Sequence, residues 1–160
     1  MDLINWLQDL AEPLPAWLQS CVIVLAGAIP FVESYAGAVI GVFVGLPVWV
    51  AVPAAIVGNW ICMFLLVTLG AGIQRRLAER SRREPSKGQQ KFLRLFNRYG
   101  VPGVSLLGQW VLPSQITSML MVGVGAAKNQ VIIWQSISIV IWGAAFGTLA
   151  VLGLSALGSL

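Results

Sequence analysis

The chain has 160 residues, of which 58 % are hydrophobic and only 10 % are charged, and its mean hydropathy is +0.83. Soluble domains average about 25 % charged residues, so this composition excludes an ordinary soluble domain and indicates a small integral membrane protein. The chain has no histidine, and its cysteines, Cys21 and Cys62, lack metal-type spacing, which removes Ser-His-Asp, Cys-His and HExxH chemistry. We therefore expect neither an enzyme nor a bound metal or cofactor.

The charged residues are concentrated in one short stretch. Nine of the ten basic residues lie within 75–98, whereas the long stretch 13–74 carries a single formal charge, Glu33. The stretches 99–127 and 129–160, on either side of Lys128, carry none. By the positive-inside rule, this distribution predicts a multi-pass protein with the basic stretch 75–98 in the cytoplasm.

Two short segments have the pattern of helices that lie in the membrane interface. Residues 3–11 place apolar side chains at helical spacing and end before Pro13. Residues 87–99 repeat this pattern with apolar side chains on one face and basic side chains on the other, and a break at 100–103 follows. We interpret the basic face as solvated and attracted to anionic lipid, with no role in binding nucleic acid.

A broken apolar run follows each of these segments. The first break, at 27–35, contains Pro30, and the second, at 108–118, contains Pro113. A long apolar helix follows each break, over about 48–73 and about 129–157. Proline inside a membrane helix frees a backbone carbonyl, which must face protein or water rather than lipid. Proline-interrupted segments at matching positions of two halves indicate a transporter binding site.

We therefore predict an all-α integral membrane protein built as an inverted repeat of an interfacial amphipathic helix, a re-entrant helical hairpin and a long transmembrane helix. The single membrane domain, 1–160, divides into a first repeat, a basic cytoplasmic loop and a second repeat, at 1–74, 75–90 and 91–160. The hairpins cover about 16–45 and about 102–127, with their tips meeting near the midplane of the membrane.

The alternative topology is four ordinary spanning helices with proline kinks. The two topologies differ in where the chain ends lie. Hairpins place both ends outside, opposite the basic loop, whereas four spans place both ends inside with it.

Glu33 is the sharpest candidate for chemistry, because it follows Pro30 by three residues at the predicted tip of the first hairpin. An ionised carboxylate inside the membrane is costly, so burial favours its protonated form, and such a group can exchange a proton for a cation. The structural alternative is that Glu33 caps the broken helix or bonds across to the second hairpin.

The polar residues near both breaks are expected to join Glu33, although any one of them taken alone is more simply a contact between helices. Trp110 is the one tryptophan inside a break and is a candidate cavity-lining ring. Gln135, in the last long helix, is a further candidate. The predicted substrate and proton site consists of Glu33, Ser34, Tyr35, Asn59, Gln109, Trp110, Ser114, Gln115, Thr117 and Ser118.

Five stretches carry a resemblance to a known family: IPFVESYAGAVIG (29–41), PAAIVGN (53–59), RYGVPGVSLLGQ (98–109), LPSQITS (112–118) and WGAAFGTLAVLG (142–153). With them the chain resembles the small multidrug export protein family, which is similar to a distant branch of the DedA/VTT superfamily of membrane proteins. The resemblance implies a bacterial plasma-membrane protein with two re-entrant hairpins.

DedA-type relatives are implicated in flipping lipid carriers such as undecaprenyl phosphate, with acidic and arginine residues in the hairpins. By resemblance, Glu33 matches the acidic residue of the first hairpin. In the second hairpin, Gln109 and Gln115 stand where arginines are expected. Because phosphate recognition favours a guanidinium group, this difference weakens the lipid-phosphate interpretation.

The predicted function is a membrane transporter for proton-coupled export of small lipophilic or cationic compounds, through a site between the hairpins. One alternative is a flippase or scramblase for a polyprenyl phosphate or a phospholipid. Another is a membrane scaffold without transport activity, with the basic loop as its partner surface. The expected partners are the lipid bilayer, a small-molecule or lipid substrate, protons and a second copy of the chain as a homodimer, but not nucleic acid.

Overall fold

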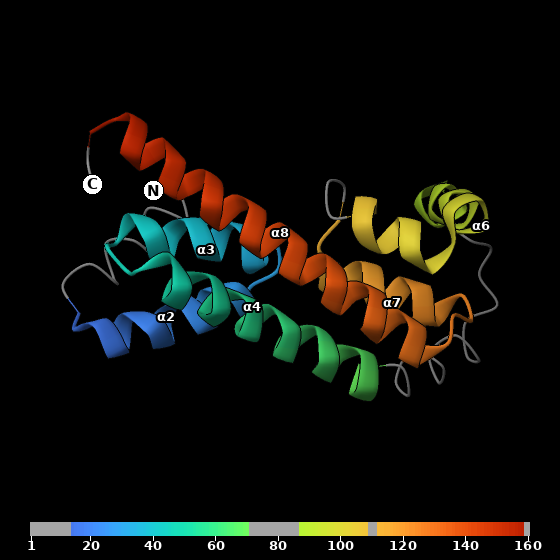
Figure 1. The fold of residues 1–160 in the computed structure, drawn as a ribbon. Coiled ribbons are helices and arrows are strands. Elements are labelled where there is room, and N and C mark those ends of the chain that lie inside the picture. The colour runs from blue at the N-terminus through green and yellow to red at the C-terminus, as the bar shows by residue number, and fades with distance from the viewer. Residues whose placement is uncertain (1–13, 71–86, 109–111, 159–160) are drawn as a thin grey trace. The chain divides into compact units, whose positions relative to one another are not determined.

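The computed structural model describes residues 14–70, 87–108 and 112–158, and all the secondary structure described in these ranges is helical (Figure 1). The all-α prediction is confirmed for this part of the chain. The predicted interfacial helix at 3–11 and most of the basic loop at 75–90 lie outside the described residues. The elements are α2 (Ala16–Ala28), α3 (Glu33–Phe43), α4 (Val48–Leu65), η1 (Leu66–Gly70), α6 (Lys87–Leu107), α7 (Ser114–Gly123) and α8 (Lys128–Ala156).

Within the described ranges, two segments are long and apolar enough to cross a membrane. They are Val48–Leu69, with 22 residues and a mean hydropathy of 2.2, and Lys128–Ala156, with 29 residues and a mean hydropathy of 2.1. The core helix of a soluble protein can pass the same test, but it is mostly buried. Only 33 % and 28 % of the most apolar windows are buried here, and large side chains such as Trp49, Leu69 and Leu149 are exposed along them.

The first of these segments changes its helical form near its end. Helix α4 ends at Leu65 and continues as the π-helical turn η1, whereas the sequence predicts one uninterrupted helix over 48–73. The hydroxyl of Thr68 donates to the carbonyl of Phe64 at 2.7 Å and to that of Leu65 at 3.2 Å. Competition of a threonine hydroxyl for these carbonyls is a local reason for the irregular turn.

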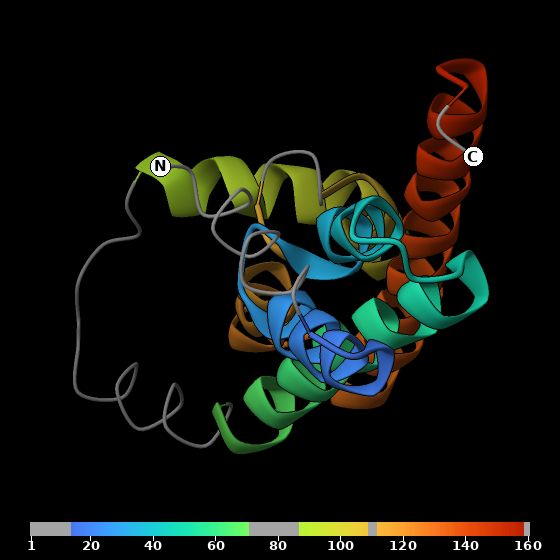
Figure 2. The same cartoon turned by 90° about the vertical axis from the view of Figure 1, so that its left-hand side faces the viewer.

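Helices α2 and α3 form a hairpin and lie side by side in both views (Figure 1, Figure 2). Helix α2 ends because Pro30 disfavours helical geometry at the residue before it, and Ile29 has extended dihedrals of φ −77° and ψ 125°. The carbonyl of Ile29 then accepts from the backbone N–H groups of Val32 and Glu33, both at 3.1 Å. The proline therefore sets the turn that leads into α3.

The same glycine turn ends α3 and α7. Gly45 has φ +92° and Gly125 has φ +99°, in the left-handed region that glycine enters without steric cost. The residue after each glycine donates to the carbonyl four residues before the glycine, at 3.0 Å in both turns. These are Schellman caps, which satisfy the last carbonyls of a helix.

Helix α6 contains a kink at the predicted break. Gly100 has non-helical dihedrals, φ 63° and ψ −169°, so the element consists of two helical pieces that meet at this residue. In the first piece Phe92 is buried, whereas Lys91, Arg94 and Arg98 are exposed. This piece is therefore amphipathic, as the sequence pattern predicts, and the second piece, 101–107, starts a new direction.

The chain divides into two compact units. The first unit contains α2, α3, α4 as far as Ile61, and α8 from Ile139 onward. The second unit is Cys62–Ser138, which contains the end of α4, η1, α6, α7 and the start of α8. Each long helix therefore contributes residues to both units.

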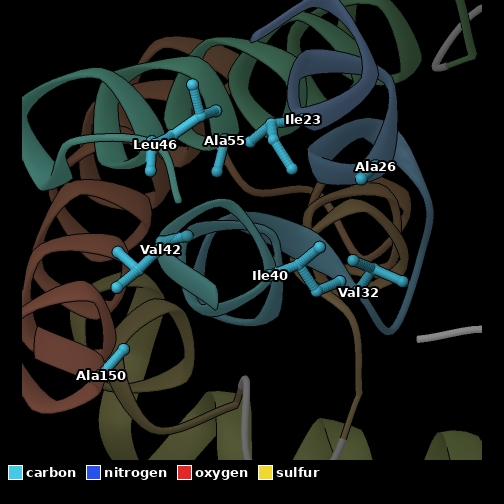
Figure 3. Close-up of a cluster of buried hydrophobic side chains, with 10 residues drawn as sticks. Ile23, Ala26, Val32, Ile40, Val42, Leu46, Ala55 and Ala150 are labelled. Carbon is cyan, nitrogen blue, oxygen red and sulfur yellow. The ribbon is translucent and has the colours of Figure 1, made fainter. Parts of the chain in front are cut away.

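The core of the first unit gathers around α3 (Figure 3). Ile23 of α2, Ile40 of α3 and Ala55 of α4 are buried in it, together with Ala150 of α8. The helices approach closely because small residues line their contacts. A Cβ added to Gly27 would meet the carbonyl of Ala55, and one added to Gly58 would meet the carbonyl of Val24. Backbone contact of this kind is typical of membrane helices.

The burial pattern of the first long helix repeats in the second. Over 51–60 and 131–140, buried, half-buried and exposed residues follow the same order at every position. The glycine turns at Gly45 and Gly125 have the same separation along the chain as these two ranges. The first arms of the hairpins also correspond, with a slightly shorter separation along the chain. There, buried Ile23, Ala26 and Gly27 match buried Val101, Val104 and Ser105, respectively.

Candidate functional site

Glu33 lies where the first hairpin turns, at the first residue of α3, and its side chain is fully buried. Its φ of +54° is unusual for a residue with a side chain. The proline-dependent turn at Ile29 holds the Glu33 backbone through the 3.1 Å hydrogen bond from its N–H. The local sequence thus places a carboxyl group inside the first unit.

Ser34 attaches the start of α3 to α8. Its hydroxyl donates to the carbonyl of Ile139 at 2.9 Å, and the side chain is fully buried. Gly143, one turn further along α8, leaves room for this contact, because an added Cβ would lie 3.2 Å from the Cβ of Ser34. Ser34 therefore acts as a link between elements of the first unit.

Tyr35 makes a hydrogen bond within the hairpin turn. Its hydroxyl donates to the carbonyl of Phe31 at 2.9 Å. Its ring lies 5.6 Å from that of Phe146, which in turn lies 5.9 Å from that of Trp142 on α8. The sequence did not single out these two aromatic residues of α8. A tryptophan and a phenylalanine four residues apart, next to glycines, are the signal that could have indicated a ring cluster on one helix face.

Asn59 is the fourth predicted residue of the first unit. It is fully buried in α4, directly after Gly58, whose backbone lies against the carbonyl of Val24 in α2. The first unit therefore contains one carboxyl, one hydroxyl, one phenol and one amide from the predicted set. The carboxyl is the only formally charged side chain among the residues described in that unit.

The predicted residues after Pro113 form the first turns of α7 in the second unit. Ser114, Gln115, Thr117 and Ser118 are all buried. The hydroxyl of Ser118 donates to the carbonyl of Ser114 at 2.6 Å, and that of Ser114 lies 3.4 Å from Oε1 of Gln115. The hydroxyl of Thr117 donates to the carbonyl of Leu112 at 3.3 Å. The three hydroxyl groups of this turn therefore donate hydrogen bonds to acceptors close by in the chain.

The structure therefore places the predicted residues in two groups, one in each unit. Gln109 and Trp110, also predicted, lie outside the described residues. Of the two predicted breaks, Pro30 is exposed and Pro113 is buried. Within the described ranges, no three His, Cys, Asp or Glu side chains come together as metal ligands.

Two buried polar residues were missed at the sequence level. Ser105, in the second piece of α6, is fully buried and accepts a 2.7 Å hydrogen bond from Ser138 through its carbonyl. Gln19, in α2, is 8 % exposed. Both lie in the first arm of a hairpin and outside the stretches 27–35 and 108–118, so only their position in an apolar run could have marked them.

Comparison of the chain with protein-family models, with curated proteins and with solved structures finds no match. The chemistry of the site must therefore be interpreted from its own residues.

Proposed function

We propose that this chain is a multi-pass protein of the bacterial plasma membrane in which both hairpins are re-entrant. The lengths of the helices support this topology. Helix α2 has 13 residues and α3 has 11, so they extend about 20 Å and about 17 Å, against a hydrocarbon core of about 30 Å. Neither arm is therefore long enough to cross alone. Four ordinary spans would instead require 16–45 to form one kinked span, whereas α2 and α3 lie side by side as a hairpin that enters and returns.

Two long helices and two short hairpins make each half cross the membrane once. The second half then enters from the opposite side, so the repeat is inverted, with the basic loop cytoplasmic and both chain ends outside. The matching burial patterns over 51–60 and 131–140, and the matching glycine turns at Gly45 and Gly125, support a repeat of one structural plan.

Within this fold we propose proton-coupled export of small lipophilic or cationic compounds. The single observation that carries this function is Glu33, a fully buried carboxyl at a hairpin turn and the only formal charge within the stretch 13–74. Buried ionisable residues in membrane segments are expensive and mark proton or substrate pathways. Glu33 would hold a proton or a cationic substrate alternately.

The stretches IPFVESYAGAVIG (29–41) and WGAAFGTLAVLG (142–153) support placing the chain in the small multidrug export protein family. The polar residues described in the second hairpin, Ser105, Ser114, Gln115, Thr117 and Ser118, are uncharged. Uncharged side chains favour a lipophilic solute over a lipid phosphate, since phosphate is usually bound by arginine or a dense cluster of donors.

Proton release tests this function with tetraphenylphosphonium, a lipophilic cation, as the probe. Addition of the cation to purified protein in weakly buffered detergent solution should release protons, measured with a pH-sensitive dye. Glu33→Gln should abolish the release, and Glu33→Asp should retain part of it. Because only the deprotonated carboxyl attracts the cation, binding to the wild type should tighten as pH rises, by at most about tenfold per pH unit.

Ser155→Ala is a matched control, because Ser155 is exposed and its hydroxyl donates only to the carbonyl of Val151 in its own helix. This variant should release protons as the wild type does. Unchanged proton release in Glu33→Gln would contradict the proposed mechanism. Uptake of a labelled polyprenyl phosphate by reconstituted protein, insensitive to the cation, would favour the flippase alternative.

A further inference from the structure

A polar seam lies in the second unit, where the 101–107 piece of α6 meets the start of α8. We use this name for Ser105, Gln135 and Ser138, all three fully buried. The hydroxyl of Ser138 donates to the carbonyl of Ser105 at 2.7 Å, which holds the two segments together. Gln135 precedes Ser138 by three residues and so lies on the same face of α8.

Three polar atoms of this seam have no hydrogen-bond partner among the residues that the structure describes. They are Oε1 and Nε2 of Gln135 and Oγ of Ser105. Leaving a buried polar group unpaired costs about 1–3 kcal/mol, so native proteins pair such groups with protein atoms, water or a ligand. The primary amide of Gln135 offers an acceptor and two donors, and the hydroxyl of Ser105 offers both functions.

The first unit shows that the helix contact itself does not need polar side chains. At the positions of the first repeat that correspond to the polar seam, the chain has Gly27, Ala55 and Gly58. There the backbones touch, since a Cβ on Gly27 would meet the carbonyl of Ala55. Small residues thus suffice to pack this contact in one repeat, whereas the other repeat carries two hydroxyls and an amide. Packing alone does not account for these polar groups.

The ligand class follows from the charges around the seam. Lys91, Arg94, Arg98 and Lys128 of the second unit are exposed, and the described side chains that are buried in this unit are uncharged. A charged group buried at the seam would meet no counter-charge there, at high cost.

We propose that the polar seam binds an uncharged group that both donates and accepts hydrogen bonds. Such a group is supplied by a hydroxyl or primary amide of a lipophilic molecule, or by water. This site goes beyond the proposed transport function, because it uses neither Glu33 nor a proton exchange.

The side-chain amide signal of Gln135 provides a direct test. The full chain is prepared in detergent micelles with 15N-labelled glutamine side chains, and the signal is assigned by its loss in Gln135→Ala. Cross-relaxation from water to this amide reports bound water, and titration with n-octanamide reports a lipophilic solute. We expect a saturable shift with octanamide that octylammonium, a charged analogue, does not produce.

Removal of the seam hydroxyls should weaken the site while Gln135 remains as the reporter. The double variant Ser105→Gly/Ser138→Gly places glycine at both positions, as the first unit has at Gly27 and Gly58. In this variant the octanamide concentration at half-saturation should rise about tenfold, as expected for one lost hydrogen bond. Ser155→Ala should leave it unchanged.

The outcomes separate the two sources of the ligand. A saturable octanamide shift identifies a solute site, and water cross-relaxation without such a shift identifies a water site. A Gln135 amide that shows neither effect in the wild-type chain would overturn the proposal, whatever the stability of the variants. Since Glu33→Gln leaves the polar seam intact, failure of proton release and failure of this site are distinguishable.

Discussion

Two residues at the turn of the first hairpin adopt a backbone conformation that side chains disfavour. Phe31 has φ +76° and Glu33 has φ +54°. Such conformations cost about 1–2 kcal/mol each and persist where the surrounding structure imposes them, often at functional sites. At this turn, the Pro30 break, the Ile29 carbonyl and the hydrogen bond from Tyr35 to the Phe31 carbonyl fix the backbone. The buried carboxyl is therefore held in a defined position.

Gly58 tests the close packing of α2 against α4. In Gly58→Ala the new methyl group would collide with the Val24 carbonyl, so we expect a loss of about 1–3 kcal/mol in the free energy of unfolding. Thermal unfolding in detergent measures this loss. Gly153→Ala is the control, because an added Cβ there meets open space, and it should be neutral or stabilising by up to about 1 kcal/mol. Equal effects of the two substitutions would contradict the contact.

Ser34 tests the link between α3 and α8. In Ser34→Ala the 2.9 Å hydrogen bond to the Ile139 carbonyl is lost, and we expect unfolding to become easier by about 0.6–1 kcal/mol. Ser20→Ala is the control, since the exposed hydroxyl of Ser20 bonds only to the Ala16 carbonyl in its own helix. Thermal unfolding of both variants measures the difference. A Ser34→Ala variant as stable as Ser20→Ala would refute the link.

The sequence could locate Glu33 and the hydroxyl groups after Pro113, because isolated polar residues in apolar stretches are conspicuous. It could not predict their partners. Tyr35 bonds to a carbonyl in its own turn, Ser34 to the Ile139 carbonyl far along the chain, and only the fold separates these cases. Ser105 was missed for the same reason, since its significance depends on Ser138 of another helix.

At the scale of elements, the two glycine turns should respond alike to substitution. Gly45 and Gly125 have nearly the same φ and no atom near an added Cβ, so the cost of alanine is confined to the backbone. We expect Gly45→Ala and Gly125→Ala each to lower the free energy of unfolding by about 1–2 kcal/mol. Asparagine, which tolerates this conformation better, should cost less at both positions. Thermal unfolding checks this, and a large difference between the two turns would argue against the repeat.

Element boundaries were predictable where proline determines them. Pro30 ends α2 and Pro113 precedes α7, because proline restricts the residue before it and cannot donate a backbone hydrogen bond. The π-helical turn at Leu66–Gly70 was not predictable, since a change of hydrogen-bond register leaves little trace in hydropathy. The kink at Gly100 was predicted as a break, but not that helix continues directly on both sides of it.

At the scale of the whole chain, the repeat is clearer in burial than in residue identity. Ala51, Ala55 and Asn59 correspond to Val131, Gln135 and Ile139, and all six are fully buried. Their chemical types differ, so the sequence showed the order of breaks and long helices but not the constant register between the two long helices. Each unit takes a hairpin, the first part of the following long helix and the last part of the other long helix. This reciprocal use of the ends of the long helices is consistent with two halves that have the same order of elements.

In the proposed topology each hairpin enters and leaves the membrane on one side, and the second hairpin does so from the side opposite to the first. The side on which the chain ends lie separates this topology from four spanning helices. Alkaline phosphatase and green fluorescent protein are fused in turn to each terminus and to the basic loop, and both activities are measured in intact bacterial cells. Re-entrant hairpins predict active phosphatase at both termini and fluorescence only at the loop. Fluorescence at the termini, on the same side as the loop, would contradict the hairpins and indicate four spanning helices.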